Sequence, residues 1–279
     1  MKRILVPVDF SPTAKKAFRF AVDIASRSGA AILLYHLYTP GRKATLGLKE
    51  NINEYNKRIG QNSLKRLQRL KKNVLADTVE VTVSTIIGRT PVINNILDFA
   101  EYNHVDMIVM GTQGAGGLNK VTVGSVAAKI MAKSGIPVLL VPEKFEWKSP
   151  ENIVFASSFN KADNNAWPVV LEITKLYGAL LTFVNISDAE NAPTETNKNN
   201  FDIYAYGLQK ELNDIRIQFK QLKTNSILKT MENLHEETPY DLLVMARRKL
   251  GFLNRFFHRS FTKKMAYITT FPLLIVPEK

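Results

Sequence analysis

The chain has 279 residues, with 38 Lys and Arg against 25 Asp and Glu and no cysteine, so its formal net charge is +13. This length allows about two domains that each bury a core. The lack of cysteine excludes disulfides, thiolate catalysis and cysteine-based metal sites. The four histidines, His36, His104, His235 and His258, show no metal-ligand spacing, so no metal site is predicted.

Membrane and secretory segments are not expected. The chain has no apolar run of about 18 residues, the length at which a spanning helix becomes plausible. Lys2 and Arg3 are followed by only five apolar residues before Asp9, too few for a secretory signal. We therefore expect a soluble, cytoplasmic protein without a membrane partner.

Short apolar strands alternate with helices along the first half. Residues 3–8 form the first predicted strand, and Ser11 with Pro12 predicts the start of a helix at 14–28 that Gly29 closes. Further strands are predicted at 31–38, 79–87, 105–110 and 137–141, and helices within 42–72 and at 92–102 and 123–134. Nearly continuous apolar strands separated by helices are typical of a parallel sheet covered on both faces.

The chain repeats itself. Residues 109–144 and 244–279 have the same length and both end in VPEK. Near the start of the second half, Ile153, Phe155, Phe159, Trp167, Ile173 and Gly178 occupy the places of Ile4, Val6, Phe10, Phe18, Ile24 and Gly29. We predict two Rossmann-like, doubly wound α/β domains with five-stranded parallel sheets, at 1–144 and 152–279, joined by a linker at 145–151. The polar stretch 187–200 is predicted to be a mobile loop.

The two final strands carry twin sequences, PVLLVPEK and PLLIVPEK. An exposed apolar edge strand is an aggregation risk that folded proteins cover. Two similar edges in one chain can pair antiparallel, which predicts that the two halves form an intramolecular pseudo-dimer.

The positive charge is concentrated in the first half. Residues 1–144 hold 21 basic and 10 acidic residues, whereas 145–279 hold 17 and 15. Ten of the basic residues lie in 42–72, where Glu50 and Glu54 are the only acids. We expect a solvated helix face there. The alternative is a surface that attracts polyanions.

A glycine-rich loop follows the strand that ends at Met110. Gly111, Gly114, Gly124 and Ser125 have G-x2-G-x9-G-S spacing. Such a loop lets backbone amides approach an anion, and the helix N-terminus at Ser125 favours phosphate. Asp9, after the first strand, could accept hydrogen bonds from a ribose at the same edge of the sheet. The alternative is a plain loop and a helix cap, but two features converging on one edge favour a nucleotide site.

These residues resemble the universal stress protein family, in particular its tandem form. The resemblance rests on PVDFS at 7–11, on VMGTQG and GS within 109–125, and on PVLLVP in the final strand. It implies a bound adenine nucleotide, usually ATP, with ADP or AMP and an accompanying Mg²⁺ as alternatives, and a regulatory role in stress. By position, it implies that Pro7, Val8 and Asp9 hold adenine and ribose, that Leu37, Met110 and Gly111 line the pocket, and that Gly114, Gly124, Ser125 and Val126 surround the ribose and phosphates.

The second half departs from this pattern. Ser158 stands in the place of Asp9, and Ala246, Lys249, Arg259 and Ser260 stand in the places of Gly111, Gly114, Gly124 and Ser125. We therefore predict a nucleotide in the first domain only. Residues 247–259 instead combine Arg247, Arg248, Lys249, Arg255 and Arg259 with Phe252, Phe256 and Phe257. These phenylalanines either fill a vacated pocket or form an anion or partner site together with the cations.

Efficient catalysis is not predicted. The sequence has no adenylation motif of the HIGH or KMSKS type and no G-x4-GK-[ST] loop. A slow ATP hydrolase is an alternative, with Asp9, Thr112 and Gln113 as candidate residues. A nucleotide-free interaction protein is the other. An unknown protein partner is expected, and a further homodimer is left open; nucleic acid is not the expected partner, although the basic segments leave it open.

Overall fold

The computed structural model describes residues 1–41, 51–76, 80–112, 124–157, 166–188, 214–224, 227–247 and 271–278. The chain divides into two compact units, Met1–Trp147 and Lys148–Lys279. Each unit is described by itself. The predicted pairing of the two halves stays a prediction.

The first unit contains a five-stranded parallel sheet. Its strands are β1 (Arg3–Pro7), β2 (Ala31–Tyr38), β3 (Val83–Arg89), β4 (Met107–Gly111) and β5 (Val138–Val141), in the order β3-β2-β1-β4-β5. Ile4 pairs with Ile32 on one side and with Met107 on the other. The strand order therefore reverses between β1 and β4, and the α/β fold class is confirmed.

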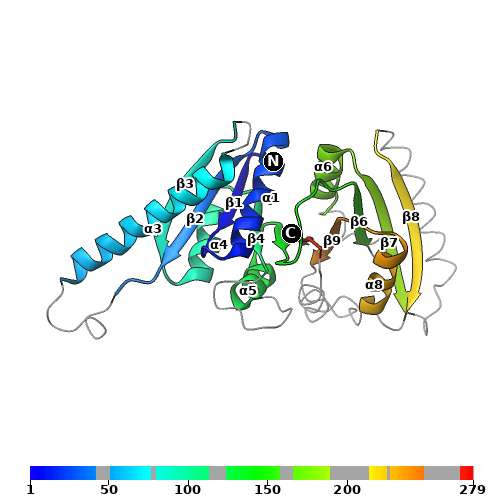
Figure 1. Ribbon diagram of the computed structural model, residues 1–279. Coiled ribbons are helices and arrows are strands. Elements are labelled where there is room, and N and C mark those ends of the chain that lie inside the picture. Colours follow the sequence, from blue (N-terminus) through cyan, green and yellow to red (C-terminus); the bar gives the residue numbers. More distant parts are fainter. Residues whose placement is uncertain are drawn as a thin grey trace. The chain divides into compact units, whose positions relative to one another are not determined.

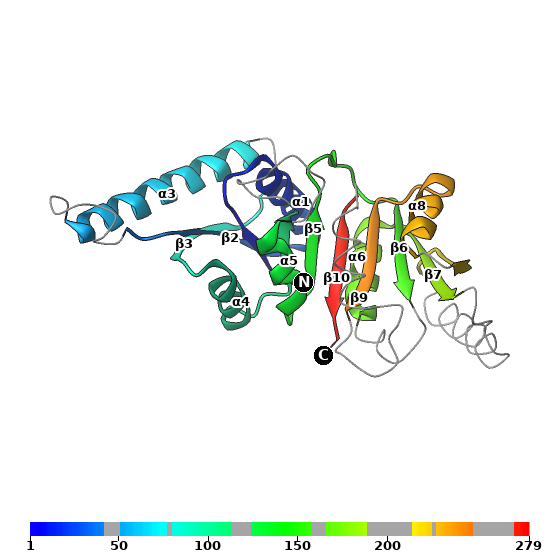
Figure 2. The same cartoon turned by 90° about the horizontal axis from the view of Figure 1, so that it is seen from below.

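Helices cover both faces of this sheet. They are α1 (Pro12–Ser28), α3 (Ile52–Leu75), α4 (Val92–Tyr102) and α5 (Ser125–Lys133). Helix α1 packs on β1, β2 and β4, and α3 lies along β2 and β3 and also contacts α1 (Figure 1). Helices α4 and α5 contact each other and lie nearer the viewer in Figure 2. The buried strand residues lie between these two helical layers.

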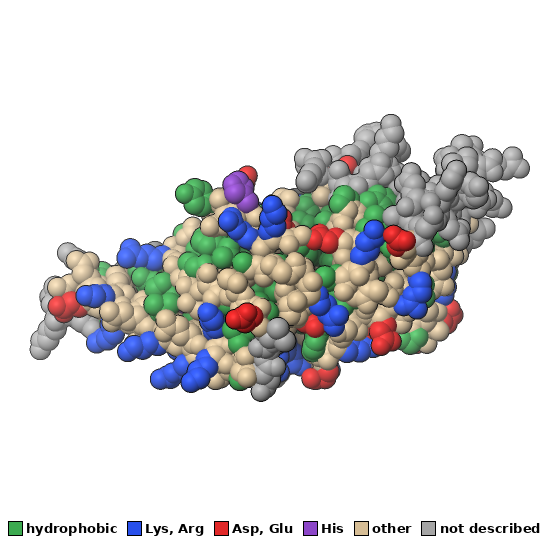
Figure 3. Space-filling model, turned by 90° about the horizontal axis from the view of Figure 1, so that it is seen from above, with side chains coloured by type: hydrophobic (Ala, Val, Ile, Leu, Met, Phe, Trp, Pro, Cys, Tyr) green, Lys and Arg blue, Asp and Glu red, His purple; other side chains and the backbone are tan. Residues whose placement is uncertain are grey.

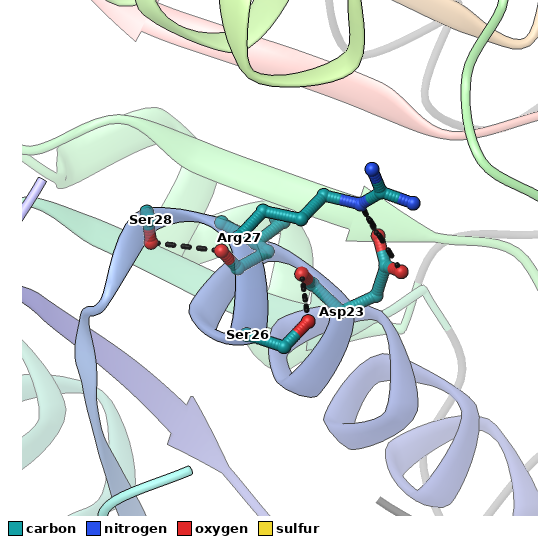
Figure 4. A network of polar contacts seen from close by, with 5 residues as sticks. Asp23, Ser26, Arg27 and Ser28 are labelled. Atoms are coloured by element: carbon teal, nitrogen blue, oxygen red, sulfur yellow. Dashed lines mark hydrogen bonds and ion pairs between the residues drawn. The ribbon is translucent and has the colours of Figure 1, made fainter. Parts of the chain in front are cut away.

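Local signals define α1 at both ends. The Ser11 side chain accepts a hydrogen bond from the Ala14 amide at 3.1 Å, with Pro12 in the first turn. Near the other end, Arg27 pairs with Asp23 one turn earlier, and Ser26 and Ser28 return hydrogen bonds to the helix backbone (Figure 4). Gly29 then adopts a φ of 72°, which favours glycine. The predicted start and stop signals are confirmed.

Strand β3 differs from its prediction at both ends. It begins at Val83 and not at residue 79, where the β-branched run predicted its start. The reason is that its pairing with β2 begins with Val83 opposite Ile32. It continues through Gly88 and Arg89, beyond the predicted end at residue 87. At Gly88 a Cβ would clash with the end of the Tyr35 side chain, so a larger residue would have to displace that ring.

The first part of the predicted linker packs on the first unit. Phe145 and Trp147 contact the buried Phe20 ring of α1, with centroids 6.3 and 4.1 Å away. The Lys16 ammonium also donates to the Glu143 carbonyl at 2.6 Å and forms an ion pair with Glu146. These contacts tie residues 143–147 to α1. The domain boundaries 1–144 and 152–279 remain a prediction; the two compact units divide between Trp147 and Lys148.

The second unit repeats the sheet. Its described elements are β6 (Asn152–Ser157), α6 (Trp167–Tyr177), β7 (Leu180–Asp188), β8 (Ile217–Thr224), α8 (Ile227–Glu237), β9 (Leu242–Arg247) and β10 (Leu273–Pro277), with strand order β10-β9-β6-β7-β8. Gly178 ends α6 with a φ of 61°, as Gly29 ends α1. The predicted loop 187–200 is wrong at Ser187 and Asp188, which pair with β8; the rest of it lies outside the described residues.

One carboxylate ties each sheet together in the same way. Asp106, just before β4, accepts the backbone amides of Lys2 and Arg3 at 2.5 and 2.9 Å. Asp241, just before β9, accepts the amides of Glu151 and Asn152 at 2.9 and 3.0 Å. Asp106 is exposed, whereas Asp241 is 4% exposed. The shared arrangement supports the duplication that the sequence predicts.

The second unit is expected to lose stability as the pH falls below 7. Burial lowers the pKa of His235 beneath its ordinary 6.5; Asp241 and Glu236 act to raise it, and Lys148 acts to lower it. The unfolded chain therefore binds this proton at a higher pH than the folded chain does. The free energy of unfolding should fall as the pH falls through 6.5 towards the folded pKa.

His235→Asn tests this expectation. The His235 Nδ1 accepts the Tyr240 amide at 3.3 Å, and an Asn oxygen can take its place. Urea unfolding between pH 7.5 and 5.5 should show a flatter pH dependence for the variant than for the wild type. Equal slopes would show that His235 does not cause the loss.

No described helix is both long and apolar enough to cross a membrane.

Candidate functional site

The chain turns sharply after β1. The Val8 amide donates to the Tyr35 carbonyl at 2.8 Å, which continues the contact between β1 and β2. Asp9 is exposed, and its Oδ1 accepts the Ser11 amide at 3.0 Å. Phe10, between them, has a φ of 64°, a conformation that costs about 1 kcal/mol or more for a residue with a side chain. Asp9 thus both closes the turn and presents a carboxylate at the carboxyl edge of the sheet.

Strand β4 ends against the first turn of α1. At Gly111 a Cβ would lie 2.7 Å from the Thr13 Cγ2 and 3.0 Å from the Thr13 backbone carbonyl carbon. Because backbone cannot yield cheaply, only glycine allows this approach. The end of β4 therefore meets the beginning of α1 immediately beyond Asp9. Met110, one residue earlier, is buried.

A pair of backbone hydrogen bonds closes the base of the glycine loop. The Thr112 amide donates to the Val141 carbonyl at 3.0 Å, and the Gly124 amide donates to the Thr112 carbonyl at 2.5 Å. The Gly124 amide is therefore engaged and is not available to a phosphate. Sequence spacing could not reveal this bond, because it depends on how the loop ends meet.

The next amides of α5 have no acceptor among the described residues. Those of Ser125, Val126 and Ala127 donate to no acceptor within the part of the chain that the structure describes, and no side chain caps this helix. Ser125 is exposed and Val126 is half-buried. The helix N-terminus at β4 thus presents three donors and a hydroxyl, an arrangement that binds anions.

The end of β2 completes the edge. Leu37 is half-buried and pairs with Gly88, while Pro7 pairs with Tyr35 at the end of β1. Because the strands are parallel, β1, β2 and β4 all end at this edge. The predicted residues Pro7, Val8, Asp9, Leu37, Met110, Gly111, Gly124, Ser125 and Val126 therefore share one edge of the sheet, and Gly114 lies outside the described residues.

The prediction missed three residues beside Asp9. The His36 Nδ1 donates to the Val8 carbonyl at 2.7 Å, and the His36 ring lies 4.4 Å from the Phe10 ring. The Arg66 guanidinium of α3 lies 4.0 Å from the Phe10 centroid. We call Phe10, His36 and Arg66 the Phe10 cluster. Phe10 follows the first strand, which was a usable signal; His36, inside β2, and Arg66, on α3, join it only through packing.

The Phe10 cluster holds a neutral imidazole. Burial lowers the pKa of His36; the Val8 carbonyl and Asp9 act to raise it, and Arg66 acts to lower it. The net shift is downward, so His36 is neutral at pH 7. Asp9 and Arg66 are both close enough to influence His36, so a carboxylate that accepts hydrogen bonds and a guanidinium that donates them lie together at this edge.

Other predicted features are only partly described. Thr112, a candidate for hydrolysis, is buried, whereas Gln113 lies outside the described residues. Ser158 and residues 248–260 of the basic loop also lie outside them, so its two alternatives stay open; Arg247, at the end of β9, is half-buried. The described residues contain no group of three or more His, Asp or Glu that could hold a metal ion.

The fold is α/β, and the candidate site lies at a strand-order reversal, where open parallel sheets bind ligands. The model of the universal stress protein family matches residues 1–142, and the chain belongs to that family. A universal stress protein of Methanocaldococcus jannaschii is 32% identical over 145 residues, which are 50% of this chain and 81% of that protein. One of Bacillus subtilis is 29% identical over 149 residues, 50% of this chain and 97% of that protein.

A solved structure matches both halves. A universal stress protein from Archaeoglobus fulgidus aligns with a TM-score of 0.71 at 17% identity, covering 99% of this chain and 96% of that one. At this identity the match shows the fold alone. Together with the half-length sequence matches, it agrees with a tandem arrangement of two domains.

Proposed function

We propose that the protein is a stress-response regulator that binds one adenine nucleotide, ATP in the first instance, in its first unit. The observation that carries this proposal is that Asp9 and the α5 N-terminus lie at the same edge of the sheet, where the strand order reverses. A carboxylate that accepts hydrogen bonds and a helix terminus that donates them suit the two ends of a nucleotide. Ribose hydroxyls donate hydrogen bonds and phosphates accept them.

The proposed ligand contacts follow from these positions. Pro7, Val8 and Leu37 would form an apolar wall for adenine, with Met110 and Gly111 beside it. Asp9 would accept from the ribose, and Ser125 and Val126 would donate to phosphate. Gly114 is proposed for the same region from its spacing alone. ADP, AMP and an accompanying Mg²⁺ fit the same chemistry.

We propose regulation instead of efficient catalysis. At the described edge Asp9 is the carboxylate that follows β1, and its Oδ1 is already engaged by the Ser11 amide. Efficient hydrolysis calls for titratable groups with separate acid and base roles. A slow ATPase is the alternative, and phosphate release from ATP and Mg²⁺ would detect it. Cytoplasmic localisation is part of the same proposal.

Asp9→Asn should weaken ATP binding about 10- to 100-fold without unfolding the protein. An Asn oxygen can still accept the Ser11 amide, so the turn is kept. The variant lacks the charged acceptor for the ribose, and a hydrogen bond to a charged group contributes about 1.5–3 kcal/mol. Titration with a fluorescent ATP analogue measures the affinity, with unlabelled ATP, ADP and AMP as competitors; cAMP is added because one solved universal stress protein is a complex with it.

Asp23→Asn is the matched control for Asp9→Asn. It removes the same charge from the far end of α1, where Asp23 pairs with Arg27. Its ATP affinity should equal that of the wild type. If Asp9→Asn bound ATP with wild-type affinity, the role of the Asp9 carboxylate would be limited to closing the turn after β1.

Arg66→Ala should weaken ATP binding about 3- to 10-fold, because Arg66 holds the Phe10 ring beside Asp9. Such cation–π contacts contribute about 0.5–2 kcal/mol. Arg69→Ala removes the same charge one turn away on the outer side of α3 and should leave ATP affinity unchanged. Equal losses in the two variants would assign the effect to net charge and not to the Phe10 cluster.

A further inference from the structure

Helix α3 carries a row of cations that the nucleotide site does not use. Arg58, Lys65, Arg69 and Lys72 are all exposed. At 100° and 1.5 Å per residue they lie within a sector of about 60° and extend over about 21 Å. We call these four residues the α3 basic row. Arg66 belongs to the Phe10 cluster and is not counted in the row.

The opposite side of α3 is already occupied. Gly60, Ser63 and Leu67 are buried, and the helix packs on β2 and β3. The basic row is therefore held in a fixed line on a rigid element. Figure 3 shows Lys and Arg side chains gathered at the left end of the molecule, where α3 lies.

Few acids offset this charge. The helix contains seven Lys and Arg and a single acid, Glu54, at its first turn. For Lys65, Arg69 and Lys72, no ion pair with another described residue is recorded. Residues 1–144 carry an excess of 11 positive charges, against 2 for residues 145–279. The row lies in the half of the chain with the stronger positive field.

We infer that the α3 basic row binds the phosphate backbone of double-stranded nucleic acid without reading its sequence. A straight line of cations matches a duplex, which carries about one negative charge per 1.7 Å of its axis. Long basic side chains on one face contact phosphates and supply affinity that is independent of sequence.

Two other polyanions fit the row less well. A membrane-bound helix inserts an apolar face into the lipid, but the apolar face of α3 packs on its own sheet. Single strands bind by stacking on exposed aromatic rings, but the sole aromatic residue of α3 is Tyr55, which Arg58 covers at 5.5 Å. Charge without an apolar or stacking surface favours the duplex.

The test is fluorescence anisotropy of the full chain with a labelled duplex DNA of about 20 base pairs and arbitrary sequence, at increasing KCl. With four phosphate contacts, affinity should fall about 150-fold between about 50 and 200 mM salt. Lys65→Gln/Arg69→Gln/Lys72→Gln leaves one contact of the row. Its binding should be much weaker at low salt and fall only about 3- to 4-fold over the same range.

The matched control removes three charges elsewhere in the same unit. Lys129, Lys133 and Lys144 are exposed, and Lys133 lies in the last turn of α5 as Lys72 lies in that of α3. Changing all three to Gln should leave duplex binding and its salt slope close to those of the wild type. Circular dichroism checks that both triple variants fold.

Three results would overturn the inference. They are no duplex binding by the wild type at low salt, equal losses in both triple variants, and binding to phosphatidylserine vesicles or single-stranded DNA in preference to the duplex. The inference is independent of the proposed nucleotide site. Asp9→Asn should lose ATP binding and keep duplex binding, so the two proposals fail separately.

Discussion

Asp241→Ala should lower the free energy of unfolding of the second unit by about 3 kcal/mol, the largest stability effect that we expect. Asp241 is 4% exposed, accepts the amides of Glu151 and Asn152, and forms an ion pair with Lys148. Without the carboxylate, two amides lose their acceptor in a partly buried place, and each such loss costs about 1–3 kcal/mol when the group is shielded from water. Lys148 is 65% exposed, so water can solvate its ammonium.

The first unit supplies the matched control. Asp106→Ala removes the equivalent carboxylate, but Asp106 is exposed, so water can reach the amides of Lys2 and Arg3. Its cost should be about 1 kcal/mol. Lys148→Ala should cost less than Asp241→Ala, because the amides of Glu151 and Asn152 still donate to the carboxylate. Equal losses for Asp241→Ala and Asp106→Ala would contradict the account.

The two tryptophans allow the measurement. Trp147 lies in the first unit and Trp167 in the second, and the chain has no others. Urea unfolding of single-tryptophan backgrounds, Trp147→Phe and Trp167→Phe, therefore follows one unit at a time. Asp241→Ala should shift the transition reported by Trp167 more than that reported by Trp147.

Because of Asp241, we also expect the second unit to lose stability in acid. Burial acts to raise the pKa of Asp241, but hydrogen bonds from Lys148, Asn152 and Glu151 outweigh it and hold the pKa below its ordinary 3.8. The folded state thus favours the ionised form more than the unfolded state does. This contribution to stability is present above pH 3.8 and is lost as the pH falls through the folded pKa.

Gly124→Leu should reduce ATP affinity more than about 100-fold, the largest effect on binding that we expect. Gly124 has a φ of −59° and a ψ of 151°, which any residue adopts, so the backbone need not change. The leucine side chain would stand at the α5 N-terminus, where the phosphates must approach the amides of Ser125 and Val126. Blocking a helix terminus removes both its donors and its favourable dipole.

Gly135→Leu is the control for a glycine-to-leucine change. Gly135 follows α5 at its other end, and a Cβ there would meet no atom within 4 Å. It should bind ATP as the wild type does, and both variants should unfold at nearly the wild-type urea concentration. If Gly124→Leu bound ATP with normal affinity, the α5 N-terminus would not be part of the ATP site.

Local sequence signals predicted much of the fold. The strand at 31–38 and the helix at 92–102 have the predicted bounds, because continuous apolar runs and the Pro91 boundary are properties of neighbouring residues. The start of β3 was wrong because it depends on a partner strand distant in sequence. The same limit hid the paired roles of Asp106 and Asp241, which become visible only when strands from different parts of the chain lie together.

In the candidate site, too, local signals were predictable and contacts between distant parts of the chain were not. Positions after strands located Asp9 and Gly111, because parallel strands end at a common edge. The Gly124 amide and the Phe10 cluster could not be predicted, since both depend on how loops and α3 pack against that edge. Local pattern thus finds the place of a site, and tertiary packing decides which groups there are free.

Isothermal titration calorimetry with ATP, on wild-type protein freed of co-purified nucleotide, tests the central claim most directly. We expect one site per chain, lost in Gly124→Leu and retained in Gly135→Leu. Two equal sites, or no heat of binding in a folded protein, would contradict the assignment of a single adenine nucleotide to the first unit.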